Sequence, residues 1–384
     1  MPSIRILFVA QYGFTTETHL KIFERFSKDL RVDEILVLVP KNIKVDKVYN
    51  PKGFVKSSEI IFDKGKILPT SFIFSGINPF SIFKKIIKFK PDVIFVLNEA
   101  FSRDIFWTAF ANILIKIFFW WQRSAKIYFY GFENINKYYT DYGIEKKLAA
   151  QFIKKTVNYG IVCTDEALKV LNEVGWHPKT KKVWWGVDLD IFIRGVSEER
   201  LQYLKRQLRI PENYYVIGYV GRFVEQKGIK ELVEAFLKLD IKAVLLLIGD
   251  GEEQGWLYKK SEENKKIIIL PFQTHNSLVL YYKLMDVLLL PSKTMSFWKE
   301  QYGRVLIEAM ASGTKVVGSR SGSIPEIIGE CGGIFREGDI NDLKNILEKE
   351  LNIKRDKRIL LERAKLGSIE NFVNQVLEFF QENL

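Results

Sequence analysis

Two successive series of short apolar segments, each followed by a longer mixed segment, constrain the fold of this chain most. In the first half these segments are rich in β-branched and aromatic residues, which is typical of buried strands: 4–10, 34–39, 93–97, 126–130 and 159–163. Segments such as 19–30 and 144–155 lie between them and have the pattern of covering helices. In the latter, Ile144, Leu148 and Phe152 recur every four residues and predict one apolar face. Strands that alternate with helices predict a parallel, doubly wound α/β sheet.

The second series begins after residue 210 and repeats this pattern. Its predicted strands are 216–220, 243–248, 266–270, 287–290 and 315–318, and its predicted helices include 229–239, 277–285 and 304–311. Two series of similar length predict two Rossmann-like domains, an N-terminal domain over 1–187 and a C-terminal domain over 188–367. A last helix over 368–384 places Phe372, Val376, Phe379 and Phe380 on one face, which we expect to be buried.

Composition excludes several classes of protein. The 384 residues, 47% of them hydrophobic, include no uncharged apolar run of eighteen or more, so we expect no membrane-spanning segment. Cys163 and Cys331 lie far apart and are typical of reduced core cysteines in a cytoplasmic protein. The three histidines have no metal-ligand spacing, so we expect no structural metal.

The positive charge is concentrated in the first half. Residues 1–195 carry 30 Lys and Arg against 19 Asp and Glu, whereas the remainder carries 28 against 27. This asymmetry favours an anionic partner of the N-terminal domain, such as a membrane surface, a lipid-phosphate acceptor or nucleic acid. A lysine-rich solvated surface is the alternative.

The most aromatic stretch, 106–121, lies in the same half. Asn112 and Lys116 interrupt it, so it is too short to span a membrane. Packing beneath the N-terminal sheet is the favoured interpretation. The alternative is that part of the stretch is exposed near the basic run 84–90 and docks on a membrane.

One segment of the second half suggests a chemistry. Glu300 precedes Gly303, a predicted helix begins at Arg304, and Glu308 lies on that helix. A helix N-terminus binds phosphate through its free N–H groups and its dipole. If both glutamates were helical, their eight-residue spacing would separate them by about 80° around the axis. We therefore expect Glu300 in a loop over the helix start, so that the two carboxylates accept hydroxyl groups on either side of a phosphate, as a sugar nucleotide requires.

A second segment supplies positive charge. Gly221 and Arg222 follow the first predicted strand of the second series, and Lys227 and Gly228 come shortly after them. A glycine at the end of a strand allows the backbone to approach a ligand closely. Two cations five residues apart suit a diphosphate and stabilise the charge on a departing nucleoside diphosphate.

Together these segments resemble the E-x7-E and G-R-x4-K-G elements of family 4 glycosyltransferases, retaining enzymes of the GT-B fold. The resemblance covers most of 158–340. It implies two Rossmann-like domains that face each other across a cleft, with the terminal helix packed back on the N-terminal domain. It also implies a hexosyltransferase-type enzyme that uses a nucleoside-diphosphate sugar, for example a UDP-sugar, as co-substrate and requires neither a cofactor nor a metal.

The resemblance assigns roles on the donor side. Glu300 matches the residue that accepts from hydroxyls of the donor sugar, and Glu308 matches the one that accepts from the ribose. Arg222 and Lys227 match the cations on the diphosphate, and Glu300, Lys227 and Arg222 are the predicted catalytic residues. The remaining predicted donor-binding residues are Gly221, Phe272 near the base, and the phosphate-facing turn of Tyr302, Gly303, Arg304 and Val305.

The acceptor side matches less well. Glu99, Glu133 and Asn134 follow predicted strands, and ligands of open α/β sheets bind at such carboxyl ends. The first loop carries one glycine, Gly13, where many family members carry two, and the family's common acceptor-side histidine has no clear counterpart. The acceptor therefore stays open among a glycan, a lipid-linked molecule and a small molecule.

We predict a retaining glycosyltransferase that acts in the cytoplasm in glycan biosynthesis, with peripheral membrane contact left open. Two alternatives belong to other classes. One is a sugar-nucleotide epimerase of the GT-B fold. The other is a protein that binds or modifies nucleic acid through its basic N-terminal half, although no recognised nucleic-acid motif supports it.

Overall fold

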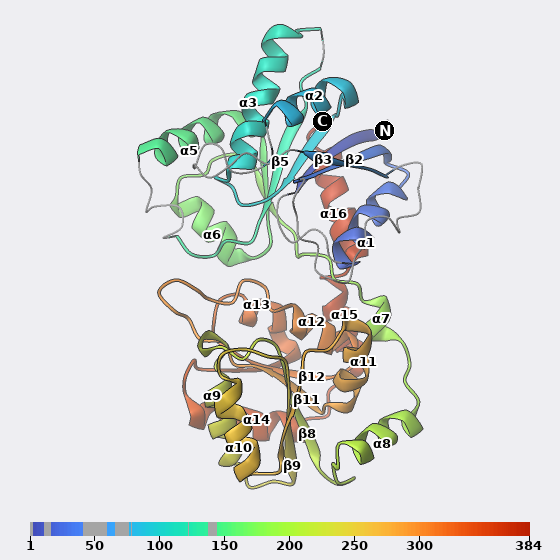
Figure 1. Ribbon diagram of the computed structural model, residues 1–384, viewed down its shortest axis with the longest axis vertical. Coiled ribbons are helices and arrows are strands. Elements are labelled where there is room, and N and C mark those ends of the chain that lie inside the picture. Colours follow the sequence, from blue (N-terminus) through green and yellow to red (C-terminus); the bar gives the residue numbers. More distant parts are fainter. Residues whose placement is uncertain are drawn as a thin grey trace. The chain divides into compact units, whose positions relative to one another are not determined.

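The computed structural model describes residues 3–10, 17–40, 60–65, 77, 79–121, 123–136 and 144–384. The chain divides into two compact units (Figure 1). The first contains Met1–Gly186 together with Ile369–Leu384, and the second is Val187–Ser368. Both are α/β, so the predicted fold class is confirmed.

The first unit contains a seven-stranded parallel sheet in the order β3-β2-β1-β4-β5-β6-β7. Its strands are β1 Ile4–Ala10, β2 Val32–Pro40, β3 Ile60–Gly65, β4 Val93–Leu97, β5 Lys126–Gly131, β6 Tyr159–Val162 and β7 Thr180–Lys182. The central strand β1 pairs with both β2 and β4, and Phe8 lies opposite Val37 on one side and Phe95 on the other. Such continuous apolar strands require cover on both faces of the sheet.

Helices provide that cover. They are α1 Glu17–Ser27, α2 Pro79–Phe89, α3 Arg103–Phe118, α5 Ile144–Thr156, α6 Asp165–Glu173 and α16 Ile369–Gln381. Residues of α2, α3, α5 and α6 share one core with alternate strand residues. On the other face, Phe8 packs against Phe23 and Phe26 of α1, and Phe26 packs against Phe372 of α16.

The terminal helix α16 lies beside α1 and packs with the first unit (Figure 1). Its four predicted core residues, Phe372, Val376, Phe379 and Phe380, are buried, which confirms the expected apolar face.

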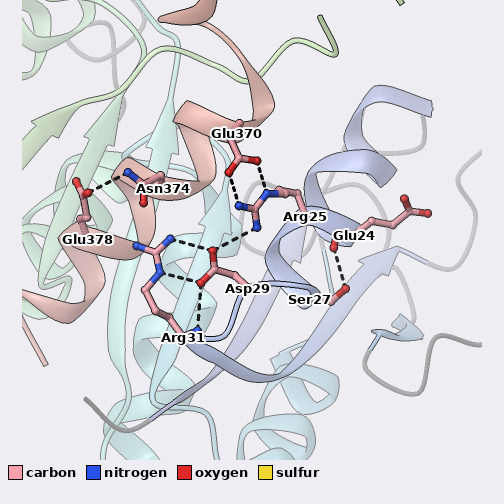
Figure 2. Close-up of polar contacts among 8 residues, drawn as sticks. All are labelled: Glu24, Arg25, Ser27, Asp29, Arg31, Glu370, Asn374 and Glu378. Carbon is pink, nitrogen blue, oxygen red and sulfur yellow. Dashed lines mark hydrogen bonds and ion pairs between the residues drawn. The ribbon is translucent and has the colours of Figure 1, made fainter. Parts of the chain in front are cut away.

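A polar contact joins the two helices as well. The Arg25 guanidinium donates two hydrogen bonds to the Glu370 carboxylate (Figure 2). Beside them, Arg31 donates to both oxygens of Asp29, at 2.8 and 2.9 Å, and holds the pKa of that carboxyl down at about 2. Residues from near both ends of the described chain are therefore in contact within the first unit.

One predicted face is wrong. Ile144 and Leu148 of α5 are 78% and 67% exposed, and Ile153 is the buried residue of this helix. Phe152 packs against Phe106 of α3, so α5 contacts the core through its last turns. The four-residue spacing does mark one apolar stripe on the helix, but only the C-terminal end of that stripe packs against the core.

The second unit contains a six-stranded parallel sheet in the order β10-β9-β8-β11-β12-β13. The strands are β8 Tyr215–Val220, β9 Ala243–Ile248, β10 Ile267–Leu270, β11 Val287–Leu290, β12 Lys315–Ser319 and β13 Gly332–Phe335. The helices are α7 Asp190–Ile193, α8 Glu198–Gln207, α9 Ile229–Leu237, α10 Gln254–Glu263, α11 His275–Leu284, α12 Arg304–Ala311, α13 Ile324–Ile328, α14 Ile340–Asn352 and α15 Lys357–Lys365, with short 3-10 turns η2 Glu225–Lys227 and η3 Gly329–Cys331. All five strands predicted here are present, and the helix predicted at 304–311 is α12.

No helix within the described ranges is long and apolar enough to cross a membrane.

Candidate functional site

Loops from neighbouring strands meet at the carboxyl edge of the second sheet, because all its strands are parallel. The loop after β8 and the loop after β9 are in direct contact: Phe223 N–H donates to the carbonyl of Asp250 at 2.5 Å. Gly249 has φ 151°, and a Cβ on it would lie 1.9 Å from the Gly221 carbonyl oxygen. Only glycine allows this approach, which brings the two strand ends together.

A pocket of about 170 Å³ lies over these strand ends. It is bounded by the loops after β8, β9 and β10 and by the first turns of α11 and α12. Its lining residues are Val220, Gly221, Arg222, Ile248, Gly249, Asp250, Phe272, Gln273, His275, Leu278, Arg304, Val305 and Glu308. Arg222 is exposed at this pocket, and its guanidinium forms no ion pair with any residue that the structure describes.

Glu308 is the buried carboxylate of the pocket, with 1% of its surface exposed. The Tyr282 hydroxyl donates to its Oε2 at 2.7 Å. Burial, and then the charge of Glu308, raises the pKa of Tyr282 well above its ordinary value, so this hydroxyl remains a donor.

The other oxygen of Glu308 has spare acceptor capacity. Arg304 Nε lies 3.0 Å from Oε1 and His275 Nε2 lies 3.6 Å from it, yet Oε1 accepts no hydrogen bond of good geometry from the described residues. A buried carboxylate oxygen in this state favours a ligand that brings a donor, such as a hydroxyl group.

Glu300 lies in the loop before α12 and is 7% exposed. Its Oε2 accepts from Lys227 Nζ at 2.6 Å and from Ser292 Oγ at 2.7 Å. Its carbonyl oxygen accepts from Ser323 N–H at 3.1 Å, and a Cβ on Gly322, which has φ 52°, would lie 2.0 Å from that oxygen. The turn that follows β12 therefore holds the backbone of Glu300, while the lysine and serine hold its side chain.

Lys227 ends the 3-10 turn η2 and is held from two sides. Besides its bond to Glu300, its Nζ lies 4.8 Å from the centre of the Trp298 ring, a cation–π contact. Gly228, with φ 65°, packs so closely on the end of β11 that a Cβ would lie 2.0 Å from the Pro291 carbonyl oxygen. Backbone packing and side-chain contacts together fix the position of the ammonium group.

The helix α12 begins as predicted. Gly303, with φ 72°, precedes Arg304, and no described side chain caps the first turn. The N–H groups at this end are therefore available to an anion, with the positive end of the helix dipole behind them. Tyr302 is buried, so its contribution to a ligand would come from its backbone.

Comparison with known proteins identifies this unit. The family described as glycosyl transferases group 1 matches residues 202–366, which include the pocket, Lys227 and Glu300. The predicted resemblance to family 4 glycosyltransferases is thereby confirmed.

Curated relatives match part of the chain. N-acetyl-alpha-D-glucosaminyl L-malate synthase of Bacillus anthracis is 31% identical over 176 residues, which cover 44% of each protein. D-inositol 3-phosphate glycosyltransferase of Thermobifida fusca is 30% identical over 203 residues, 48% of this chain and 45% of the relative. The matches thus span less than half the length of these relatives. They give no support to an epimerase or to a nucleic-acid-binding protein.

Solved structures match the whole chain. Anabaena HepE in complex with UDP has a TM-score of 0.75 at 17% identity, over 99% of this chain and 100% of that one. A glycosyltransferase from Rickettsia africae has a TM-score of 0.73 at 18% identity, over 100% and 99%. At this identity the likeness shows the fold, and the predicted GT-B fold is confirmed.

The second unit brings together most of the predicted donor-side residues. Six of them line the pocket: Gly221, Arg222, Phe272, Arg304, Val305 and Glu308. Lys227 and Glu300 form their own pair and do not line it, and Tyr302 and Gly303 form the turn before α12. This unit also contains three contributors that the sequence did not indicate, namely Tyr282, Ser292 and Trp298. Ser292 follows a predicted strand and could have been found by that rule, whereas no local signal marks Tyr282 or Trp298.

The predicted acceptor-side residues lie in the first unit. Glu99 accepts from the N–H groups of Phe132, at 2.8 Å, and Glu133, at 3.1 Å, so it fixes the loop after β5. Glu133 accepts from Ile135 N–H at 2.9 Å, and Asn134 is buried. Gly13 lies outside the described residues. Each of the two glutamates thus has a local structural contact, and the acceptor role of these residues stays a prediction.

Metal ligands were not expected. Within the described residues, no group of three or more His, Cys, Asp and Glu side chains is placed to hold a metal ion.

Proposed function

We propose that the protein is a glycosyltransferase that moves a sugar from a nucleoside-diphosphate sugar to an acceptor hydroxyl. The observation that carries this proposal is the pocket at the carboxyl edge of the second sheet. It combines an exposed Arg222, the uncapped N-terminus of α12, and Glu308 Oε1, which is ion-paired with Arg304 but accepts no hydrogen bond from the described residues. Cationic and N–H groups suit a diphosphate, and a buried carboxylate suits a ribose.

In this proposal the nucleoside lies in the pocket. The base lies near Phe272, a ribose hydroxyl donates to Glu308 Oε1, and the diphosphate extends toward Arg222 and the start of α12. A uridine nucleotide is the first choice of donor, because the structurally similar Anabaena HepE binds UDP and glucose. That likeness is one of fold alone, so the base is a matter for measurement.

The sugar lies toward the Lys227–Glu300 pair. Glu300 is acceptor-only when ionised, so its carboxylate suits the hydroxyls of a sugar placed beside the pair. The ammonium group of Lys227 has three N–H bonds and donates one of them to Glu300, which leaves others for a phosphate oxygen. The pair can therefore hold the sugar and the diphosphate at their junction without separating.

The bond that breaks joins the anomeric carbon to the diphosphate oxygen. Negative charge grows on the leaving diphosphate, and Arg222, Lys227 and the α12 dipole stabilise it. We propose attack by the acceptor hydroxyl on the face from which the diphosphate leaves. Its proton passes to a leaving-group phosphate oxygen, so the anomeric configuration is retained without an enzyme nucleophile. The positive charge needed here is supplied by the chain, and the proposed reaction uses no metal.

Thermal stabilisation by nucleotides tests the donor side first. A ligand that binds the folded state raises the melting temperature by mass action. We expect UDP and UDP-sugars to stabilise the protein more than adenosine or guanosine diphosphates do. Glu308→Gln should weaken this effect, and Glu262→Gln, an exposed change of the same kind, should not. A protein that no nucleoside diphosphate stabilises would contradict the proposal.

The activity itself is tested by incubating the full chain with the donor that stabilises it and a panel of hydroxyl acceptors. We expect acceptor-dependent release of nucleoside diphosphate, and a product whose anomeric configuration, read by NMR, equals that of the donor. An isomerised sugar nucleotide without an acceptor would instead show an epimerase. An inverted product would refute retention.

A further inference from the structure

The end of α3 exposes a group of large apolar side chains. Figure 1 shows that this helix extends beyond the strands of its own unit. There Trp120 is 80% exposed, Trp121 is 68% exposed, and Ile117 and Phe118 are also exposed. The sequence left open whether the stretch 106–121 is core or surface. In the structure its first part contributes to the core and its end lies on the surface. Thr108, Ala109 and Ile115 in its first part are buried, whereas Ile117, Phe118 and the two tryptophans at its end are exposed.

Isolated exposed apolar residues are ordinary, but a consecutive group of this size marks an interaction surface. Two neighbouring tryptophans limit the kind of partner. Their rings combine an apolar body with an N–H donor, which suits the boundary between lipid headgroups and acyl chains. Water can accept from the indole N–H but offers no apolar contact for the ring.

A cationic pocket shares residues with the same helix. Its volume is about 440 Å³, and its lining includes Lys116 of α3, Lys126 at the start of β5 and Lys155 near the end of α5. None of these lysines forms an ion pair with a described residue. Lys116 directly precedes Ile117 and Phe118, so the pocket and the apolar group adjoin along α3. A concentration of uncompensated positive charge favours an anion.

Asn112 adds an acceptor to this pocket. It is buried, and its Nδ2 donates to the Ala125 carbonyl at 2.9 Å, while its Oδ1 accepts from no described residue. Buried acceptors of this kind ordinarily have a partner. A ligand with a phosphate for the lysines and a hydroxyl donor for Asn112 would satisfy the whole pocket.

We propose that this surface docks the protein on an anionic phospholipid membrane, with the headgroup of one lipid in the pocket. The phosphate lies among Lys116, Lys126 and Lys155, and a headgroup hydroxyl donates to Asn112 Oδ1. Trp120 and Trp121 enter the interfacial layer beside it. The excess of Lys and Arg in residues 1–195, 30 against 19 Asp and Glu, adds long-range attraction to a negative bilayer. The proposal is independent of glycosyl transfer.

Nucleic acid is the competing anion. A nucleic-acid site tracks the backbone along a groove with several phosphate contacts, whereas here one pocket adjoins a group of protruding apolar side chains. The combination fits a lipid better, because a lipid offers a charged head and an apolar body in one molecule.

Vesicle sedimentation with the full chain tests the proposal. Vesicles of phosphatidylglycerol and phosphatidylcholine are compared with vesicles of phosphatidylcholine alone. We expect binding to the former and little to the latter, with weakening as salt screens the charges. Lys116→Gln/Lys126→Gln/Lys155→Gln should weaken binding at least about tenfold, because each lysine near an anionic surface strengthens it about fivefold. Trp120→Ser/Trp121→Ser should weaken binding at any salt concentration.

A matched control makes the same change of charge in a different part of the protein. Lys238→Gln/Lys242→Gln/Lys259→Gln removes three exposed lysines of the second unit and should bind vesicles as the wild type does. Circular dichroism and melting temperature establish that each variant is folded. Equal binding to both kinds of vesicle overturns the proposal, as does equal loss in the control. So does a triple-lysine variant that keeps vesicle binding but loses binding to single-stranded DNA.

Discussion

The Lys227–Glu300 pair permits a quantitative test. The side chains are 14% and 9% exposed, and Nζ and Oε2 are 2.6 Å apart. Removing one partner of a buried pair costs about 3–5 kcal/mol. Here Ser292 Oγ still donates to the same oxygen after Lys227→Met, so we expect a loss of about 2 kcal/mol. Glu300→Gln should cost about as much, because it leaves the ammonium group without its carboxylate.

The double variant Lys227→Met/Glu300→Gln should be destabilised no more than either single variant. The coupling free energy is then about 2 kcal/mol, measured from urea unfolding of the four proteins. The two units can unfold in separate transitions. The four proteins are therefore compared in the one transition that the single variants shift. Lys365→Met is the control: both side chains of its ion pair with Glu362 are exposed, and we expect little change.

Measurements of nucleotide binding and of sugar transfer should also distinguish the roles of Lys227 and Glu300. Lys227→Met should weaken binding of the nucleoside diphosphate. Glu300→Gln should bind the nucleoside diphosphate nearly normally yet lose most sugar transfer, since in the proposed complex the sugar is the only part of the donor that this carboxylate contacts. Strictly additive losses of stability would refute the structural argument. Near-normal transfer by either folded variant would refute the assigned roles.

Three further predictions follow from contacts in the two units. Tyr282→Phe removes the hydrogen bond to buried Glu308 and should lower stability by about 2 kcal/mol and weaken nucleotide binding, as calorimetry would show; unchanged affinity would contradict the role of Glu308. Gly322→Ala places a Cβ against the Glu300 carbonyl at φ 52° and should cost about 1–3 kcal/mol and reduce transfer, whereas Gly255→Ala, with open space around it, should not. Arg31 lowers the pKa of Asp29 to about 2, below its unfolded value of about 3.9, so this carboxylate contributes about 2 kcal/mol at neutral pH that is lost as pH falls from about 4 to 2. Asp29→Asn should therefore differ from wild type at pH 6 and converge with it near pH 2 in urea unfolding; a constant difference would exclude the linkage.

The sequence predicted elements that are specified locally. β1 and β4 have the predicted bounds, because their residues are apolar on both faces and the runs end at polar residues. Ile144 and Leu148 were predicted to be buried and are exposed. A helical period shows which residues share one face of a helix, but whether another element covers that face depends on residues distant in sequence.

The candidate site shows the same division. Gly221, Arg222, Arg304 and Glu308 could be predicted to converge, because the first two follow a strand and the last two lie in the first turns of a helix at one edge of a parallel sheet. Tyr282 could not, because its hydroxyl meets Glu308 only after α11 and α12 pack together.

The place of α16 has a consequence for the order of folding. Phe372 and Glu370, from the end of the described chain, complete the face of the first sheet that Phe26 and Arg25 begin. During synthesis all of the second unit, Val187–Ser368, leaves the ribosome before this helix does. The first unit must wait with an uncovered apolar face until the last helix is made, so the unit that comes second in sequence is the first able to fold.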